Sequence, residues 1–476
     1  MVTFCFRKLL WTGCILILLW WPSIGLLAQP VTPAAFSLPA LIDSAQHHLP
    51  VLRQKMALVE AAKAGIRDAK DAYLPTSFLG DELLVGSDNS LPGTYYSFGL
   101  IPSTSSGINL ANNSQPAGGN MAFLFNEYDL VTFGLKRAAV RHAEAGEHLS
   151  QADLDRERYL LKWQIARLYL SIRKSLLQQG IDSENIKRYS ELYTVIRAVT
   201  LSGIKPGADS ALAMAELSGA RTAYNNAYGQ GRQLYQELSY YTGLPSGGIR
   251  VDTSRIRDNL SQRRVNGLSL DLPGPDSIRA PNPLTDYFVR EQELYQETEN
   301  LVKKSYLPRI MLTGIAWARG SSINYQGKYG PVTDGWGYQR FDYLAGLTVT
   351  YNLFDLVHRR DKEAIARQET VASEYGLQQE QLELQNVGSK ANEGIQTAVR
   401  NLAELPIQIS AAQSAFSQKT AQYKAGIINL VDLAEASFVL YRAQSDYVSA
   451  ISDWLSYNLD KAAASGDLDL FIQTIQ

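Results

Sequence analysis

The segment from Tyr343 to Leu353 alternates between apolar residues at odd positions and small or polar residues at most even positions. A period of two is typical of a β-strand whose two faces meet different surroundings. About ten residues are enough for a tilted strand to cross a bilayer. The pattern predicts a membrane strand with Leu347, Val349 and Tyr351 facing lipid and Thr348, Thr350 and Asn352 facing a lumen.

Residues 309 to 319 are expected to form the partner strand of this hairpin. An earlier segment is less regular. Met121, Phe123 and Phe125 share one parity, but Tyr128 and Leu130 follow on the other, which predicts a bulge or a change of register. Taken alone, these segments would also fit an ordinary half-buried hairpin in a soluble domain.

Two very long helices are predicted from a different period. No proline occurs between Gly134 and Ser202, and apolar residues recur there at spacings of three and four, as at Leu161, Ile165, Leu168 and Ile172. At a rise of about 1.5 Å per residue, this helix would be on the order of 100 Å long. Residues 356 to 425 show a similar seam, although Pro406 is expected to kink that helix.

The chain is an internal tandem duplication. Residues 203 to 227 match residues 426 to 450 without a gap, and Tyr73-Leu74-Pro75 corresponds to Tyr306-Leu307-Pro308. A first repeat over 29–241 is predicted to hold a helix, a β-hairpin at about 76–130, a long helix at about 134–202 and a helix at about 206–241. A linker over 242–284 leads to a second repeat over 285–476, with a helix, a hairpin at about 309–353, helices at about 356–425 and 430–462, and a tail.

Composition and the N-terminus bear on location. The formal charge of −2 gives no support for nucleic-acid binding. Arg7 and Lys8 precede an apolar run from Leu9 to Trp21, which predicts a signal peptide over 1–28 with cleavage after Ala28. Both cysteines, Cys5 and Cys14, fall within it, so no disulfide is expected in the mature protein; lipidation at Cys14 is the alternative.

The number of strands limits how the chain could enter a membrane. Two hairpins supply four strands, whereas the smallest membrane barrels close with about eight. Open strand edges in lipid would leave backbone groups unpaired at several kcal/mol each. We therefore expect several chains to share one barrel.

Several motifs together resemble the outer membrane efflux proteins, the TolC family. They are Tyr-Leu-Pro before each hairpin, Leu353-Phe354-Asp355 before Arg359-Arg360, Tyr423-Lys424-Ala425-Gly426 before Asp432 and Ala436, and Leu41-Ile42-Asp43-Ser44-Ala45 before His48-Leu49-Pro50. The resemblance implies an α+β membrane protein: a homotrimer with a twelve-strand β-barrel, four strands per chain, continuous with a long α-helical periplasmic barrel. It also implies the outer membrane of a Gram-negative bacterium as location, outer-membrane lipid around the barrel, and an equatorial band near residues 242 to 284.

The ends of the long helices are candidate contact sites. Gly203 and Gly426 can adopt the left-handed conformation that caps a helix, and Asp209 and Asp432 can accept N–H groups at the start of the next helix. The resemblance implies that these tips also meet a periplasmic adaptor (membrane fusion) protein that leads to an inner-membrane pump. Gln418, Gln422 and Tyr423 are candidates for a periplasmic constriction because they lie near the turn.

No pattern of residues indicates catalysis. The histidines do not form a pair at helical metal-binding spacing, and no nucleophile elbow or phosphate loop occurs, so neither an enzyme nor a cofactor or metal site is expected. The expected function is the exit duct of a tripartite efflux system for small molecules. The alternatives are a duct for type I protein secretion or metal-ion efflux, and a periplasmic coiled-coil scaffold without a pore.

Overall fold

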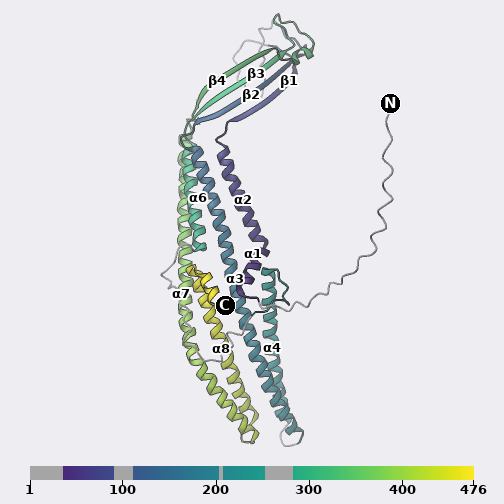
Figure 1. Ribbon diagram of the computed structural model, residues 1–476, viewed down its shortest axis with the longest axis vertical. Helices are drawn as coiled ribbons and strands as arrows, with labels where there is room; N and C mark the ends of the chain where they lie inside the picture. The colour runs from purple at the N-terminus through teal and green to yellow at the C-terminus, as the bar shows by residue number, and fades with distance from the viewer. Residues whose placement is uncertain (1–35, 90–110, 203–206, 252–281, 476) are drawn as a thin grey trace, which may run out of the picture.

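The protein is a long helical body with a β-sheet at one end, as seen in a computed structural model (Figure 1). The structure describes residues 36–89, 111–202, 207–251 and 282–475. The predicted signal peptide, Gly203 and most of the predicted 242–284 linker lie outside the described residues.

The first repeat begins with two helices where one was predicted, α1 (Leu38–His48) and α2 (Pro50–Asp71). The prediction was incomplete because Pro50 can start a helix but holds the preceding residue, Leu49, in an extended conformation. The strands β1 (Thr76–Gly86) and β2 (Ala117–Val131) follow. Helix α3 (Leu135–Leu201) starts after Gly134, whose φ is +93°, and α4 (Gly207–Thr242) completes the repeat.

The second repeat has the same order of elements. Helix α6 (Pro283–Ser305) leads to β3 (Arg309–Ser321), a short 3-10 helix η2 (Val332–Trp336) and β4 (Arg340–Thr350). The long helix α7 (Asp355–Lys424) and α8 (Leu430–Ser465) follow. The expected C-terminal tail contains a further helix, α9 (Leu468–Ile475), because Leu468, Phe471 and Ile472 bury one apolar face against the body.

The helix α7 continues through Pro406 to Lys424. In Figure 1 it runs straight beside α6 and changes direction in its lower part, beside α8. The change of direction agrees with the kink expected from an interior proline, which removes one backbone hydrogen bond.

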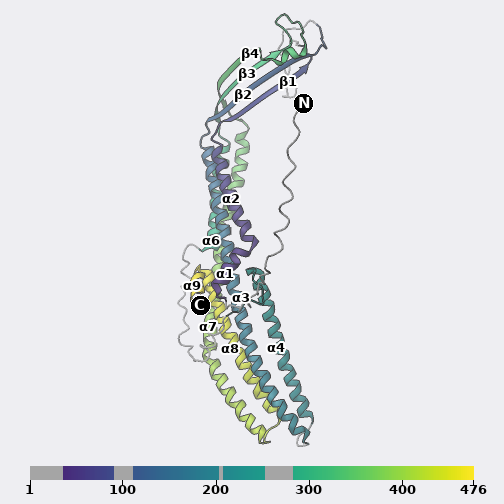
Figure 2. The same cartoon turned by 45° about the vertical axis from the view of Figure 1, so that its right-hand side comes forward.

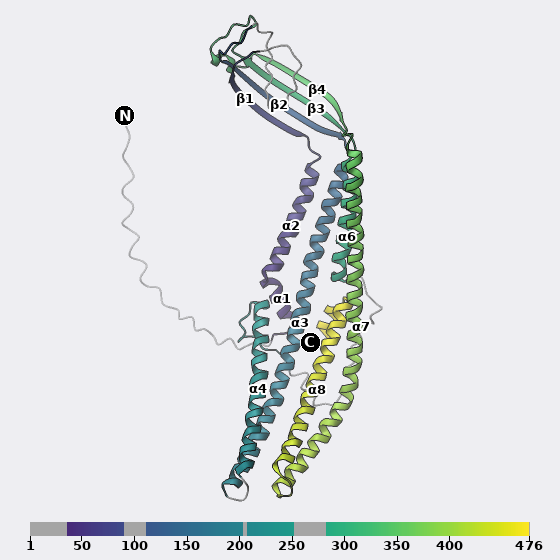
Figure 3. The ribbon, with the colours of Figure 1, turned by 180° about the vertical axis from the view of Figure 1, so that it is seen from behind.

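The elements form a single layer, four across, at each of three levels (Figure 3). The sheet has the order β1-β2-β3-β4, and all its pairs are antiparallel. Next to the sheet, the packed neighbours are α2 with α3, α3 with α6, and α6 with α7. At the far end they are α4 with α3, α3 with α8, and α8 with α7. The first repeat therefore supplies one edge of the layer at every level, and the second repeat supplies the other.

Helices from the two levels stack end to end at mid-height. Asn282 is fully buried before α6, and its side-chain amide donates to the carbonyls of Ala463 and Ala464 in the last turn of α8, at 3.3 and 3.0 Å. In the first repeat, the Ser44 hydroxyl donates to the carbonyl of Thr242 at the end of α4, at 2.9 Å. The helices α1 and α9 lie at mid-height in Figure 2. The largest apolar cluster of the described residues draws on both, and its fully buried side chains include Leu41, Leu52, Ile165, Leu459 and Phe471.

Candidate functional site

The strand register determines which side chains share a face of the sheet. Leu347 pairs with Leu312 and Val349 with Ile310, whereas Thr348 pairs with Met311 and Thr350 with Arg309. Cross-strand partners project to the same side, so these pairs define a leucine face and a threonine face. The pairing across all four strands puts one charged residue, Asp81, on the leucine face and seven on the threonine face. The seven are Glu82, Glu127, Asp129, Arg309, Arg319, Arg340 and Asp342.

The strand predicted over 343–353 ends earlier than expected. β4 stops at Thr350, so Tyr351 and Asn352 do not belong to it. Asn352 instead forms the turn into α7, because its side chain accepts from the N–H of Phe354 at 3.2 Å and donates to Asp355 at 2.8 Å. A short polar side chain that bonds to the following backbone favours such a turn over a strand. The assignments of Tyr351 to a lipid-facing strand position and of Asn352 to a lumen-facing one are therefore wrong.

An irregularity is present in β2, but it lies between Asp129 and Val131 and not between Phe125 and Tyr128, where the change of parity predicted it. Because it follows Tyr128, the residues Phe123, Phe125 and Tyr128 are all in continuous register. Phe123 and Phe125 therefore lie on the threonine face, and Tyr128 lies on the leucine face beside Leu312. Two aromatic side chains of β2 thus stand on the face that carries most of the charge of the sheet.

The α7–α8 tip is a capped helical turn. Gly426 has φ of +74°, and the N–H groups of Gly426 and Ile427 donate back to the carbonyls of Tyr423 and Gln422, at 3.0 and 2.9 Å. Asp432 lies in the first turn of α8, but the capping side chain is Asn429, which accepts the N–H of Asp432 at 2.9 Å. Asp209 has the equivalent place in the first turn of α4.

Tyr423 connects the two helical hairpins. Its side chain is 7% exposed and lies in a cluster with Ile196 of α3, Ala213 of α4 and Leu430 and Leu433 of α8. Burial raises the pKa of Tyr423, and the negative charge of Asp209 raises it further. The ring therefore fills the core between the hairpins rather than lining an open passage, unlike the exposed Gln418 and half-buried Gln422.

A row of polar side chains joins α3 to α8 above the tips. Asp182 is 2% exposed, and its Oδ1 accepts hydrogen bonds from the Tyr441 hydroxyl and from Gln178 Nε2, both at 2.9 Å. Gln178 also donates to Ser445 at 3.0 Å, and Arg188 donates to Gln444 at 3.3 Å. Burial raises the pKa of Tyr441, and its bond to Asp182 adds to the shift. These contacts hold the hairpins side by side.

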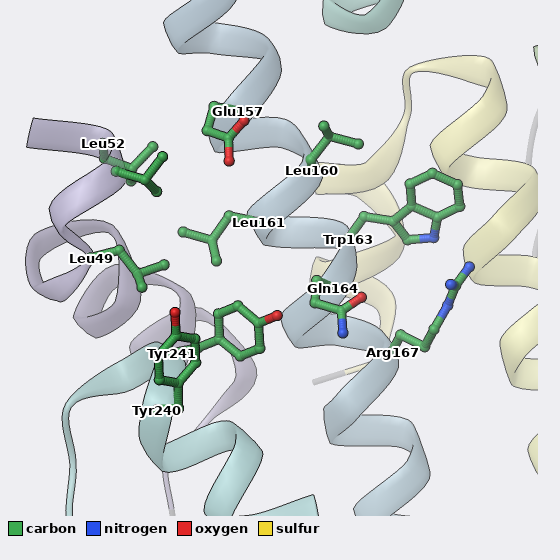
Figure 4. Close-up of a pocket in the computed structure, with 11 residues that line it drawn as sticks. Leu49, Leu52, Glu157, Leu160, Leu161, Trp163, Gln164, Arg167, Tyr240 and Tyr241 are labelled. Atoms are coloured by element: carbon green, nitrogen blue, oxygen red, sulfur yellow. The ribbon is translucent and has the colours of Figure 1, made fainter. Parts of the chain in front are cut away.

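A pocket of about 480 Å³ lies at the first repeat's edge of the layer, where α2, α3 and the end of α4 meet (Figure 4). Its wall is largely apolar, and Tyr240 and Tyr241 of α4 face Leu161 and Gln164 of α3. Arg167, the cationic residue of the wall, pairs with Asp460 of α8 at 2.8 Å. The arrangement offers a binding surface at an edge and lacks a paired nucleophile and base among its lining residues.

Within residues 36–89, 111–202, 207–251 and 282–475, no group of three or more His, Cys, Asp or Glu side chains could hold a metal ion. None of the helices in the same ranges combines the length and apolar character needed to span a membrane.

Most of the second repeat matches the sequence profile of a known protein family. A sequence profile of the family described as outer membrane efflux protein matches residues 290–464. The resemblance expected from the motifs is therefore confirmed for the repeat that contains α7, α8 and Gly426. No curated protein sequence matches the chain.

Solved structures extend the likeness of fold to both repeats. The outer-membrane channel OprN has a TM-score of 0.73 at 16% identity, covering 92% of this chain and 91% of that one. VceC from Vibrio cholerae has a TM-score of 0.73 at 14% identity, over 90% of this chain and 96% of that one. The open MtrE channel of Neisseria gonorrhoeae has a TM-score of 0.67 at 17% identity, over 90% and 89%. The fold of these outer-membrane proteins thus spans nearly the whole chain.

Sequence reasoning missed two structural residues of the site. Asn429 was identifiable, because an Asn just before an apolar helical run is a typical N-cap. Asn282 also precedes a Pro-initiated helix, but its contacts to Ala463 and Ala464, 181 and 182 residues away, had no local signal.

Proposed function

We propose that the chain is the exit duct of a tripartite efflux system, which passes small molecules from a periplasmic adaptor and an inner-membrane pump to the exterior. The observation that carries the proposal is the open layer of four elements, which has one edge in each repeat at all three levels. A strand edge in lipid would leave a row of backbone groups without partners. Head-to-tail association of identical chains closes such edges in a ring.

Three chains are the number that we propose. Three sheets of four strands form a barrel of twelve (3 × 4), and the helical levels close with it. Exposure of the apolar side chains on the leucine face supports a lipid boundary there: Leu347 is 64% exposed and Val349 65% exposed. The threonine face, which carries seven charged residues as well as Thr348 and Thr350, then lines the water-filled lumen.

The helical tips are the proposed contact with the adaptor. Gly426, Asp432 and Asp209 lie at the end of the body opposite the sheet, as the α4 and α8 ends in Figure 1 show. Gly203 is proposed to act in the same way in the first repeat, and Gln418 and Gln422 remain candidates for a constriction. We propose that the sheet lies in the outer membrane and that the helices lie in the periplasm.

Conductance tests the proposal directly. The purified protein, added to planar lipid bilayers, is expected to form ion-conducting channels, and Thr348→Arg is expected to change their conductance. A protein that enters the bilayer without conducting would contradict the duct and favour a scaffold without a pore.

A further inference from the structure

The threonine face carries a continuous apolar surface halfway along the strands. Phe78, Phe125, Ile315 and Leu344 are paired across all four strands, and Phe123 and Trp317 are paired on the next step of the same face. We call these six residues the aromatic patch. They lie between Glu82, Arg319, Arg340 and Asp342 toward the outer end and Glu127, Asp129 and Arg309 toward the helices.

The patch is built from packed side chains. The rings of Phe78 and Phe125 have centroids 6.2 Å apart and planes tilted by 32°. The ring of Phe123 covers Gly80, where an added Cβ would lie 2.5 Å from the Phe123 Cζ atom. Even so, Phe78 remains 57% exposed and Leu344 58% exposed, so the patch offers open apolar surface.

Lipid is the obvious alternative occupant, and the charges argue against it. The patch shares its face with seven charged residues, and the leucine face carries one. A charged side chain on the lipid face of a barrel is destabilising, most strongly near the membrane midplane. Arg319 and Asp342 form an ion pair at 3.4 Å directly beside Trp317, which places water-seeking groups next to the patch.

We infer that the aromatic patch is a contact site inside the duct for molecules with aromatic or other apolar parts. This inference rests on the proposed function, because it requires the threonine face to line a lumen. In a trimer, three patches face the same passage. Aromatic rings attract organic cations and stack with flat aromatic solutes, so cationic aromatic molecules would be held longest.

The test uses two cations of equal charge, tetraphenylphosphonium and tetramethylammonium, added at the outer side of the channel in planar bilayers. Tetraphenylphosphonium is expected to reduce the current in a saturable way, and tetramethylammonium is not. The double variant Phe123→Thr, Phe125→Thr is expected to weaken the apparent affinity for tetraphenylphosphonium on the order of tenfold. Leu124→Thr, on the leucine face between these two residues, is the matched control and should leave that affinity unchanged.

The possible failures are distinguishable. Conducting channels that tetraphenylphosphonium does not block, or whose block is the same in the double variant, would overturn the inference and leave the duct intact. An absence of conductance would overturn the duct itself.

A labelling measurement checks the faces if a variant folds poorly. Cys5 and Cys14 are the native cysteines and precede the predicted cleavage after Ala28, so single introduced cysteines can be read cleanly. A charged, water-soluble thiol reagent should modify Phe123→Cys in the membrane-embedded protein and spare Leu124→Cys. The reverse pattern would place the patch in lipid and overturn the inference.

Discussion

The junction between α8 and α6 depends on Asn282, and Asn282→Ala should be among the most destabilising single changes in the helical body. The side chain has no exposed surface and makes three hydrogen bonds. Its amide donates to Ala463 and Ala464, and its Oδ1 accepts the N–H of Leu284 at 3.0 Å. Asn282 therefore caps both the end of α8 and the start of α6.

The magnitude follows from counting the groups left without partners. Ala463 retains a hydrogen bond from the Tyr159 hydroxyl at 2.8 Å, so its carbonyl stays satisfied in the variant. The carbonyl of Ala464 and the N–H of Leu284 lose the partner that Asn282 supplied. A buried polar group without a partner costs about 1–3 kcal/mol, so the variant should lose about 2–6 kcal/mol per chain.

The assay is denaturant unfolding in detergent, followed by circular dichroism, with hydrogen exchange at the first turn of α6 as a local readout. Asn429→Ala is the matched control, because Asn429 also caps a helix with a single bond of 2.9 Å but is exposed. Loss of an exposed cap costs about 1 kcal/mol. Equal losses for the two variants would refute the account of a buried double cap.

Three further predictions concern the membrane strand, the tip and the helical body. Leu347→Arg should impair membrane assembly by about 2–4 kcal/mol, whereas Thr348→Arg should assemble and alter conductance; equal assembly defects in membrane fractions would show that the faces are misassigned. Gly426→Val should cost roughly 1–2 kcal/mol, because a β-branched residue tolerates φ of +74° poorly. The variant should still assemble, but its crosslinking to the adaptor should weaken. Unchanged crosslinking and export would mean that the tip is only a cap. Burial raises the pKa of Glu380 above its ordinary value of 4.5, against an opposing effect of the Arg156 charge. The protonated Glu380 side chain therefore contributes fully to stability below pH 4.5, and this contribution falls as pH rises through the folded-state pKa. Glu380→Gln should therefore be more stable than the native protein at pH 7 and not at pH 4, and a stability difference that does not depend on pH would contradict this.

The long helices could be predicted because their signals are local. The absence of breakers and the spacing of Leu161, Ile165 and Leu168 predict one helix, and Gly134 marks its start through a conformation that glycine favours. The same holds for β4, where alternation indicates the faces without reference to other strands.

The remaining features depend on contacts between distant segments. The face occupied by Phe123 and Phe125 is set by the position of the irregularity between Asp129 and Val131, which is defined only by pairing with β3. Tyr423 looked like a lining residue because it precedes the turn, but it packs against Ile196 and Ala213 of the other hairpin. Nothing within a window of a few residues distinguishes these arrangements from their alternatives.

The number of chains in the particle is the most direct test of the duct. The sheet of one chain has four strands and ends in the edge strands β1 and β4, which the proposed ring of identical chains would pair. Light scattering of the detergent-extracted protein, corrected for bound detergent, should give a protein mass three times that of the mature chain. A stable monomer, with the mass of one mature chain, would contradict the shared barrel and the function that depends on it.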